Sequence, residues 1–197
     1  MTIEERKAIW REARSPSMKY HHFLGSIPPS VRLTFEPLSY ENGMYLYDMF
    51  KEDSNPYVDE RFKTAEEAED YLACMLEYAC FSQKRAAFDW LIKCQTTNEY
   101  IGVFHVHDLS KQVFGGDNLK VTLGYAFSKS FRKKGFANET LQHFSKIIFE
   151  KTNKTKLLVY TDKNNKDSIR LMERLSWQRV DEKYVYSEQY AYFELWK

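Results

Sequence analysis

Residues 131–137 form a glycine-containing segment with the composition of an anion-binding turn. It reads Phe-Arg-Lys-Lys-Gly-Phe-Ala and stands between a strand-like and a helix-like segment. The first amide N–H groups of a helix have no partner inside the helix, and the helix dipole adds positive potential there. Gly135 lets a ligand approach the backbone closely, while Arg132, Lys133 and Lys134 supply charge. The segment predicts a site for phosphate or pyrophosphate.

Two common phosphate-binding motifs are absent from this part of the sequence. No G-K-[ST] follows a glycine-rich stretch, and no G-x-G-x-x-G occurs, so a Walker loop and a dinucleotide fingerprint are excluded. An ordinary strand-to-helix turn with solvated lysines remains the alternative.

The flanking elements follow from hydrophobic periodicity and capping signals. Helices are expected over 2–13, 40–51, 65–83, from 136 onward, and from an Asp167 cap through Leu175. Strands are expected over 31–37, 86–95, 100–108, 119–128, 156–161, 178–186 and 189–196. Short turns join the strands between 86 and 128, which favours antiparallel hairpins. The helix between strands 119–128 and 156–161 implies a crossover and parallel pairing.

Composition narrows the class of protein. The 197 residues suffice for one α/β (α+β) domain over 31–197, with residues 1–30 as an N-terminal extension that contains a short helix and a linker. A net charge of +1 argues against a broad nucleic-acid footprint. No apolar run approaches the ~20 residues that span a bilayer, and the start of the chain lacks a signal-peptide core. We expect a cytoplasmic protein, monomeric or homodimeric, without a membrane partner.

Three motifs in order resemble those of the GNAT superfamily of N-acetyltransferases. Arg132-x-x-Gly135-x-Ala137 is similar to the family's Q/R-x-x-G-x-G/A motif, and Leu123–Phe127 to its fourth strand. The segment from Asn164 through Ser168 to Leu175 resembles the pattern after the fifth strand. Arg32-Leu33, Glu36-Pro37-Leu38 and the Thr64 cap are similar to the ribosomal-protein N-acetyltransferase branch. Ser176-Trp177 replaces the usual Gly-Phe, and Thr122 replaces a frequent glutamate.

This resemblance implies the fold and the acetyl donor. The expected fold is a mixed, mostly antiparallel sheet of about seven strands with helices on both faces. Its fourth and fifth strands would be parallel and splayed apart. Acetyl-CoA would lie in that gap as the cosubstrate. The family's cofactor residues correspond to Tyr125, Ala126 and Phe127 along the pantetheine arm, and to Arg132, Lys133, Lys134, Gly135, Phe136 and Ala137 around the pyrophosphate, with Asn164 nearby.

Catalysis would then be direct attack of an amine on the thioester, with no acyl-enzyme and no metal. The resemblance assigns Ser168 and Asn164 to the neighbourhood of the sulfur; Tyr160 and Tyr184 are alternative acids. His105 and His107 alternate on one strand, so both point to one face and are candidate bases. Glu36, Asp89 and a water relay are further options.

The acceptor is open at this stage. Asp53, Asp59 and Glu60 are expected to border the amine side, where carboxylates would attract a cation. Tyr45, Tyr57, Phe62 and Trp90 are candidate pocket walls. The first hypothesis is an enzyme that acetylates a protein N-terminal or ribosomal-protein amine. The second is an enzyme that acetylates a small amine (an amino sugar, polyamine or amino acid). The third is a catalytically silent CoA-binding module.

Overall fold

The computed structural model describes residues 26–81, 88–107, 120–180 and 189–197, together with residues 2, 4, 5 and 8. In the extension, the amide of Thr2 donates to Glu5 and the amide of Glu5 to the Thr2 hydroxyl, which forms a capping box at the start of the helix expected over 2–13. The rest of that helix, the turn at 115–118, most of strand 178–186 and Tyr184 lie outside the described residues.

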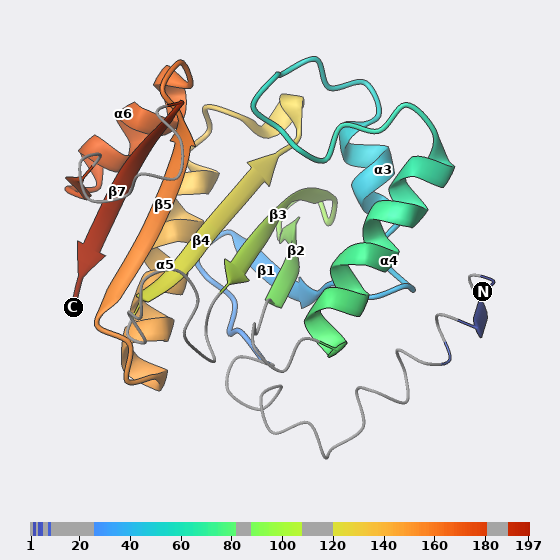
Figure 1. The fold of residues 1–197 in the computed structure, drawn as a ribbon, viewed down its shortest axis with the longest axis horizontal. Helices are drawn as coiled ribbons and strands as arrows, with labels where there is room; N and C mark the ends of the chain where they lie inside the picture. Colours follow the sequence, from blue (N-terminus) through green and yellow to red (C-terminus); the bar gives the residue numbers. More distant parts are fainter. Residues whose placement is uncertain are drawn as a thin grey trace.

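Seven strands form one mixed sheet in the order β1-β2-β3-β4-β5-β7-β6 (Figure 1). Only β4 and β5 are parallel; every other neighbouring pair is antiparallel. The strands are β1 (Leu33–Pro37), β2 (Phe88–Cys94), β3 (Tyr100–His107), β4 (Lys120–Phe127), β5 (Lys156–Asp162), β6 (Gln178–Arg179) and β7 (Tyr190–Trp196). The mixed, mostly antiparallel sheet predicted from the sequence is confirmed.

The two parallel strands pair only at one end. Their register runs from Lys120 opposite Lys156 to Thr122 opposite Leu158 and stops there. Beyond that point, residues 123–127 of β4 still pair with β3, while residues 159–162 of β5 pair with β7. The sheet therefore opens between β4 and β5, and the edges of both strands turn toward the gap backbone groups that pair with no other described strand.

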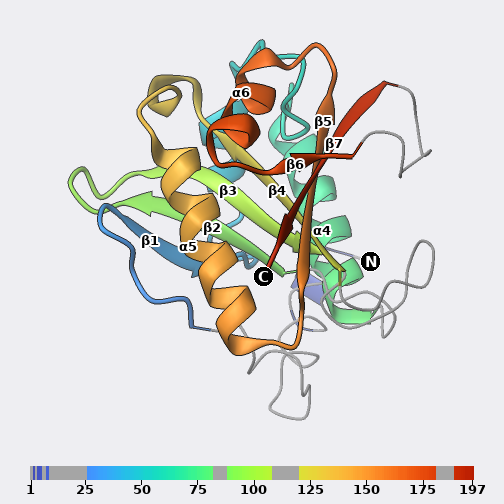
Figure 2. The same ribbon diagram turned by 90° about the vertical axis from the view of Figure 1, so that its left-hand side faces the viewer.

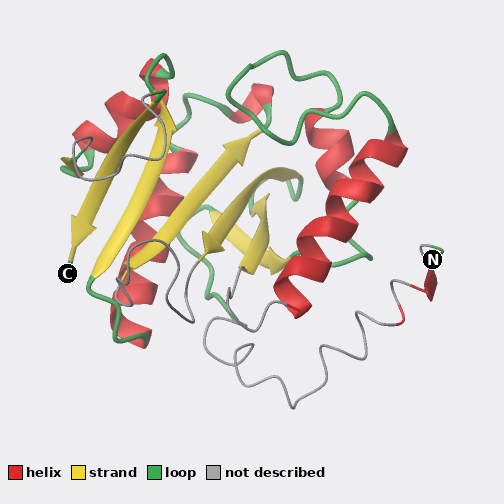
Figure 3. Cartoon of the chain, viewed as in Figure 1, coloured by secondary structure: helices red, strands yellow, loops and turns green. Residues whose placement is uncertain are grey.

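Helices cover both faces of this sheet (Figures 2 and 3). On one face, α5 (Phe136–Lys151) and α6 (Lys166–Arg174) share a core with the strands that includes Phe104, Phe144 and Met172. On the other, α3 (Tyr45–Phe50) and α4 (Ala65–Phe81) pack over a second core that includes Val103. Val103 and Phe104 are adjacent, as expected for a strand whose side chains alternate between two buried faces. None of the described helices is long and apolar enough to cross a membrane.

Two helix starts differ from the sequence expectation. Helix α3 begins at Tyr45 rather than Tyr40, because the Asn42 side chain accepts from the Ser39 amide and donates to the Pro37 carbonyl, holding a turn instead. The cap of α6 is Asn165 rather than Asp167: its side chain accepts from the Ser168 amide at 3.3 Å. The Thr64 cap of α4 is as predicted, with the Glu67 amide donating to the Thr64 hydroxyl.

The end of α6 keeps a left-handed turn without glycine. Ser176 has φ 59°. Its amide donates to the Glu173 carbonyl, and the Trp177 amide donates to that of Met172. This pair of bonds is a Schellman motif, in which the left-handed residue is usually glycine. The motif therefore forms despite the serine, with a backbone cost that a glycine would avoid.

Candidate functional site

The segment singled out from the sequence is a left-handed turn leading into α5. Lys133 has φ 60° and Gly135, the N-cap of the helix, has φ 83°. A 16-residue helix follows, so its aligned peptide dipoles and first amides face the turn. Lys133 is largely exposed, 3.6 Å from Asp167, and the Lys134 ammonium lies over the Phe131 ring. This geometry suits a bound pyrophosphate.

Arg132 has a bracing role that its sequence position did not reveal. Its Nε donates to the Phe127 carbonyl at 2.8 Å, and its guanidinium forms an ion pair with Asp53, whose side chain is 2% exposed. The side chain thus ties the turn to the end of β4 and to the segment after α3. Asp53 was expected to border the amine side of the cleft, but its carboxylate is buried in this ion pair with Arg132.

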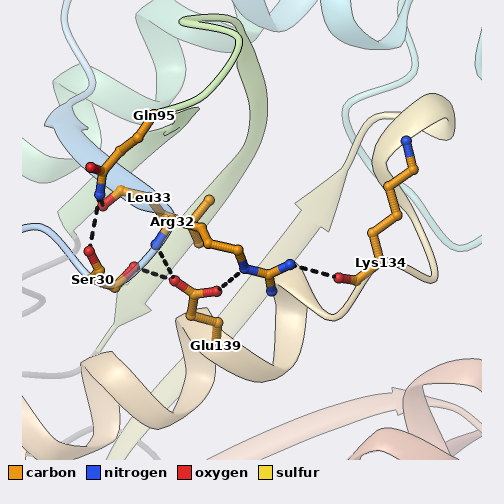
Figure 4. Close-up of polar contacts among 6 residues, drawn as sticks. All are labelled: Ser30, Arg32, Leu33, Gln95, Lys134 and Glu139. Atoms are coloured by element: carbon orange, nitrogen blue, oxygen red, sulfur yellow. Dashed lines mark hydrogen bonds and ion pairs between the residues drawn. The ribbon is translucent and has the colours of Figure 1, made fainter.

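A second brace joins the start of β1 to the same turn (Figure 4). Glu139, in the first turn of α5, accepts from the Ser30 hydroxyl at 2.7 Å and from the amide and Nε of Arg32 at 2.8 and 2.7 Å. Arg32 also donates to the Lys134 carbonyl at 3.1 Å and lies over the Phe136 ring. The Arg32 cation neutralises the one acidic side chain in the first turn of α5, which would otherwise repel an anion.

A cleft of about 640 Å³ opens where β4 and β5 separate. On the α5–α6 side it is lined by Tyr125, Asn165 and Ser168, and on the α4 side by Glu60, Tyr71, His105 and Thr122. Residues from both faces of the sheet therefore border one continuous space. Among the other candidates, Tyr57, Asp59, His107, Ala126 and Tyr160 also line it.

A hydroxyl pair lies on the α5–α6 side of the cleft. The Tyr125 and Ser168 oxygens are 2.9 Å apart. Burial raises the pKa of Tyr125 to about 12, more than the hydrogen bond to Ser168 lowers it, so the phenol is neutral and can donate. Ser168 thus lines the cleft, and the phenol of Tyr125, a residue predicted only to lie along the pantetheine arm, is its hydrogen-bond partner.

Asn164 does not lie in this cleft. It is exposed, and its amide donates to Asp162. Asn165 lines the cleft, caps α6 beside Ser168 and donates to Thr161 at 3.0 Å. The family pattern after the fifth strand begins N-x-x-S, and in this sequence Asn165 and Ser168, not Asn164 and Ser168, have that spacing. The spacing was therefore the signal that would have identified Asn165.

The two candidate bases on β3 differ in their surroundings. Nδ1 of His105 is 2.6 Å from Asp89 and Nε2 is 2.9 Å from Glu60. Although burial alone lowers the pKa of His105, the hydrogen bonds and charges of both carboxylates outweigh it and raise the pKa to about 10. The raised pKa favours the imidazolium form of His105 near neutral pH, and this form has no lone pair to accept a proton. His107 is half-buried at the cleft.

Several other sequence candidates lie away from the cleft lining. Glu36 accepts from the Tyr100 hydroxyl and lies 3.9 Å from Lys93. Phe62 and Trp90 are buried in the cores, and Tyr45 packs on Tyr100. Only Tyr57 of the four proposed aromatic walls borders the cleft.

Comparisons with known proteins agree with this geometry. The model of the acetyltransferase (GNAT) domain matches residues 32–178. No curated protein sequence matches the chain. An acetyltransferase from Agrobacterium tumefaciens str. C58 has a similar structure, with TM-score 0.66, 19% identity, and coverage of 87% of this chain and 96% of that one.

Two further solved structures share the fold. RimL, a ribosomal α-N-protein acetyltransferase in complex with coenzyme A, gives TM-score 0.64 at 17% identity, covering 86% of this chain and 97% of its own. An acetyltransferase from Salmonella typhimurium modifies the N-terminal serine of a 50S ribosomal subunit protein. Its structure gives TM-score 0.61 at 16% identity, covering 87% of this chain and 98% of its own. Together with the domain match over most of the chain, the splayed sheet and the turn at Gly135 establish that this chain belongs to the acetyltransferase (GNAT) family.

Proposed function

We propose that this N-acetyltransferase transfers the acetyl group of acetyl-CoA to the free α-amine of a peptide or protein by direct attack. One observation carries the proposal: the cleft passes through the sheet between β4 and β5. A donor held against α5 on one face and an amine entering from the α4 face would meet there without a covalent enzyme intermediate.

On the donor side, the amides of residues 133–137 would hold the pyrophosphate, with Lys133 and Lys134 adding charge. The unpaired edge of β4 from Tyr125 to Phe127 offers backbone groups to the pantetheine arm. The departing thiolate needs a proton, and the neutral phenol of Tyr125, bonded to Ser168, is the donor that this geometry favours.

The volume of the cleft and the exposed side chains at its border favour a peptide as the acceptor. A cleft of about 640 Å³ has room for the thioester end and several acceptor atoms besides. Tyr57 and Tyr160, which are 39% and 50% exposed, stand at its border and offer stacking surfaces. Asp59 and Glu60 lend it negative charge that suits an incoming ammonium. The ribosomal-protein acetylation named for RimL and for the Salmonella enzyme makes an α-amine the first acceptor to test.

Thiol release from acetyl-CoA tests the proposal. The acceptors are short peptides with a free first residue, the same peptides with a blocked α-amine and an internal lysine, spermidine and glucosamine. We expect release with free peptides and none with blocked ones, and mass spectrometry should find the acetyl group on the first residue. Thiol release with spermidine or glucosamine, but with none of the peptides, would instead identify a small amine as the acceptor. Saturable acetyl-CoA binding without any release would contradict catalysis altogether.

A further inference from the structure

Glu60, in the segment between α3 and α4, is a buried carboxylate that borders the cleft. The residue is 4% exposed. Its Oε1 receives hydrogen bonds from the Tyr71 hydroxyl at 3.3 Å and from Nε2 of His105 at 2.9 Å. Its Oε2 accepts no hydrogen bond from any residue in the described part of the chain. One oxygen is thus fixed in place, while the other can meet a ligand in the cleft.

His105 holds this carboxylate in position. Both of its ring nitrogens contact carboxylate oxygens, and these two carboxylates raise the pKa of His105, which favours a positively charged ring that donates from both nitrogens. Asp89 on β2, directly opposite His105 in the register, anchors the far side of the ring. The ring holds Glu60 in place through Nε2, and in its charged form it cannot itself accept a proton.

This cluster lies beside the point where the sheet opens. His105 is opposite Gly124 on β4, two residues past the last β4–β5 pair at Thr122. A Cβ added to Gly124 would lie 3.3 Å from Cδ2 of His105, so the imidazole rests on the backbone of β4. Thr122 has no carboxylate, whereas the ribosomal-protein N-acetyltransferases that the sequence resembles often carry a glutamate at this position. Glu60 provides one from another segment, across a single imidazole ring from β4.

We propose that Glu60 is the proton acceptor for the incoming amine, with His105 as its positioning residue; this inference rests on the proposed function. The ammonium gives a proton to Oε2, and the neutral nitrogen attacks the carbonyl carbon of the thioester. The C–N bond forms, the C–S bond breaks, and the nitrogen loses its second proton as the thiolate gains one through Tyr125. Glu60 then returns its proton to solvent, so one proton is released for each acetyl group transferred.

The charged and titratable groups around Glu60 are consistent with this role. Tyr71 of α4 donates to Oε1, and burial together with Glu60 raises its pKa, so it remains a neutral donor. Asp59, adjacent in sequence, reaches solvent but is partly desolvated by the surrounding protein; this desolvation and the charge of Glu60 raise its pKa. It offers the proton a path to solvent. His107 on β3 also borders the cleft.

The variant Glu60→Gln tests the inference, because its amide oxygen can still accept from Tyr71 and His105. We expect kcat/KM for a peptide amine near neutral pH to fall about 100-fold, the low end of general-base effects. The loss should shrink as the pH approaches the pKa of the amine, since a neutral amine needs no proton acceptor. Acetyl-CoA affinity should stay within about twofold, because Glu60 lies outside the donor site. Glu69→Gln, on the exposed face of α4, is the matched control.

Two outcomes would overturn the role of Glu60: a rate within twofold of wild type, or a loss of the same size at every pH. If Glu60→Gln melts early, Glu60→Asp supplies the same test, since a carboxylate at this position should keep the wild-type pH profile. A wild-type enzyme that acetylates no amine would refute the proposed function itself. Wild-type turnover with an unaffected Glu60→Gln variant would refute only this inference.

Discussion

The brace between Arg32 and Glu139 should hold both the fold and the anion-binding turn, and Glu139→Ala tests this. The substitution removes a hydroxyl bond from Ser30, an amide bond from Arg32 and an ion pair with the Arg32 guanidinium. Hydrogen bonds to a charged group contribute about 1.5 kcal/mol each. The ion pair adds less than about 1 kcal/mol, because the Arg32 side chain is 43% exposed. We expect a total loss of about 3 kcal/mol.

Thermal and chemical unfolding measure this loss. For a chain of this size, about 3 kcal/mol corresponds to a Tm lower by roughly 6–12 °C. Glu150→Ala on the same helix is the matched control, because its pair with Lys146 is exposed on both sides and should contribute less than about 0.5 kcal/mol. Equal effects of Glu139→Ala and Glu150→Ala would refute the brace.

The pH dependence of the same variant gives a second readout. Burial would raise the pKa of Glu139, but the hydrogen bonds from Ser30 and Arg32 and the Arg32 charge outweigh it, so the pKa is lowered. The brace therefore stabilises the fold fully above the ordinary glutamate pKa of about 4.3, and its contribution disappears as the pH falls through the lowered value. The Tm gap between wild type and Glu139→Ala should close on acidification. Because Arg32 also holds the Lys134 carbonyl, acetyl-CoA affinity should fall about fivefold, equivalent to ~1 kcal/mol.

Two further substitutions have clear expected results. Ser176→Gly should raise the free energy of unfolding by about 1 kcal/mol in urea melts, since Ser176 holds φ 59°; an unchanged or lower midpoint would remove the strain argument. Gly135→Val should abolish acetyl-CoA binding by calorimetry, because a branched residue at φ 83° strains the turn and enters the anion site. Wild-type affinity in a folded Gly135→Val variant would exclude this turn as the pyrophosphate site.

Local sequence patterns predicted most of the fold, because most elements here obey local rules. Alternating apolar residues located the strands, and the helix between 128 and 156 implied the parallel pair that opens the sheet. The errors came where side chains compete with backbone hydrogen bonds. The Asn42 side chain bonds the backbone of Ser39 and Pro37 and so holds a turn where the first part of α3 was expected. Asn165, rather than Asp167, is the N-cap of α6.

Sequence patterns indicated the candidate anion-binding turn but not the cluster of side chains around His105. The turn and the following helix are contiguous in sequence, so composition alone indicates an anion site around Gly135. The cluster combines Glu60, Asp89 and His105 from three separate segments. No spacing in the sequence shows that two carboxylates flank one imidazole, and that contact favours a cation over a base at His105. Asp53 was likewise taken for a substrate-facing acid, although it is buried against Arg132.

In the proposed reaction, acetyl-CoA and the amine meet through the gap between β4 and β5. The most direct measurement is a crystal structure with a bisubstrate analogue in which coenzyme A is joined through an acetyl bridge to a peptide α-amine. We expect the pyrophosphate at the amides of residues 133–137, the sulfur near the hydroxyls of Tyr125 and Ser168, and the peptide nitrogen within hydrogen-bonding reach of Glu60. An analogue whose peptide arm stays on the α5 face, away from Glu60, would contradict the proposed reaction.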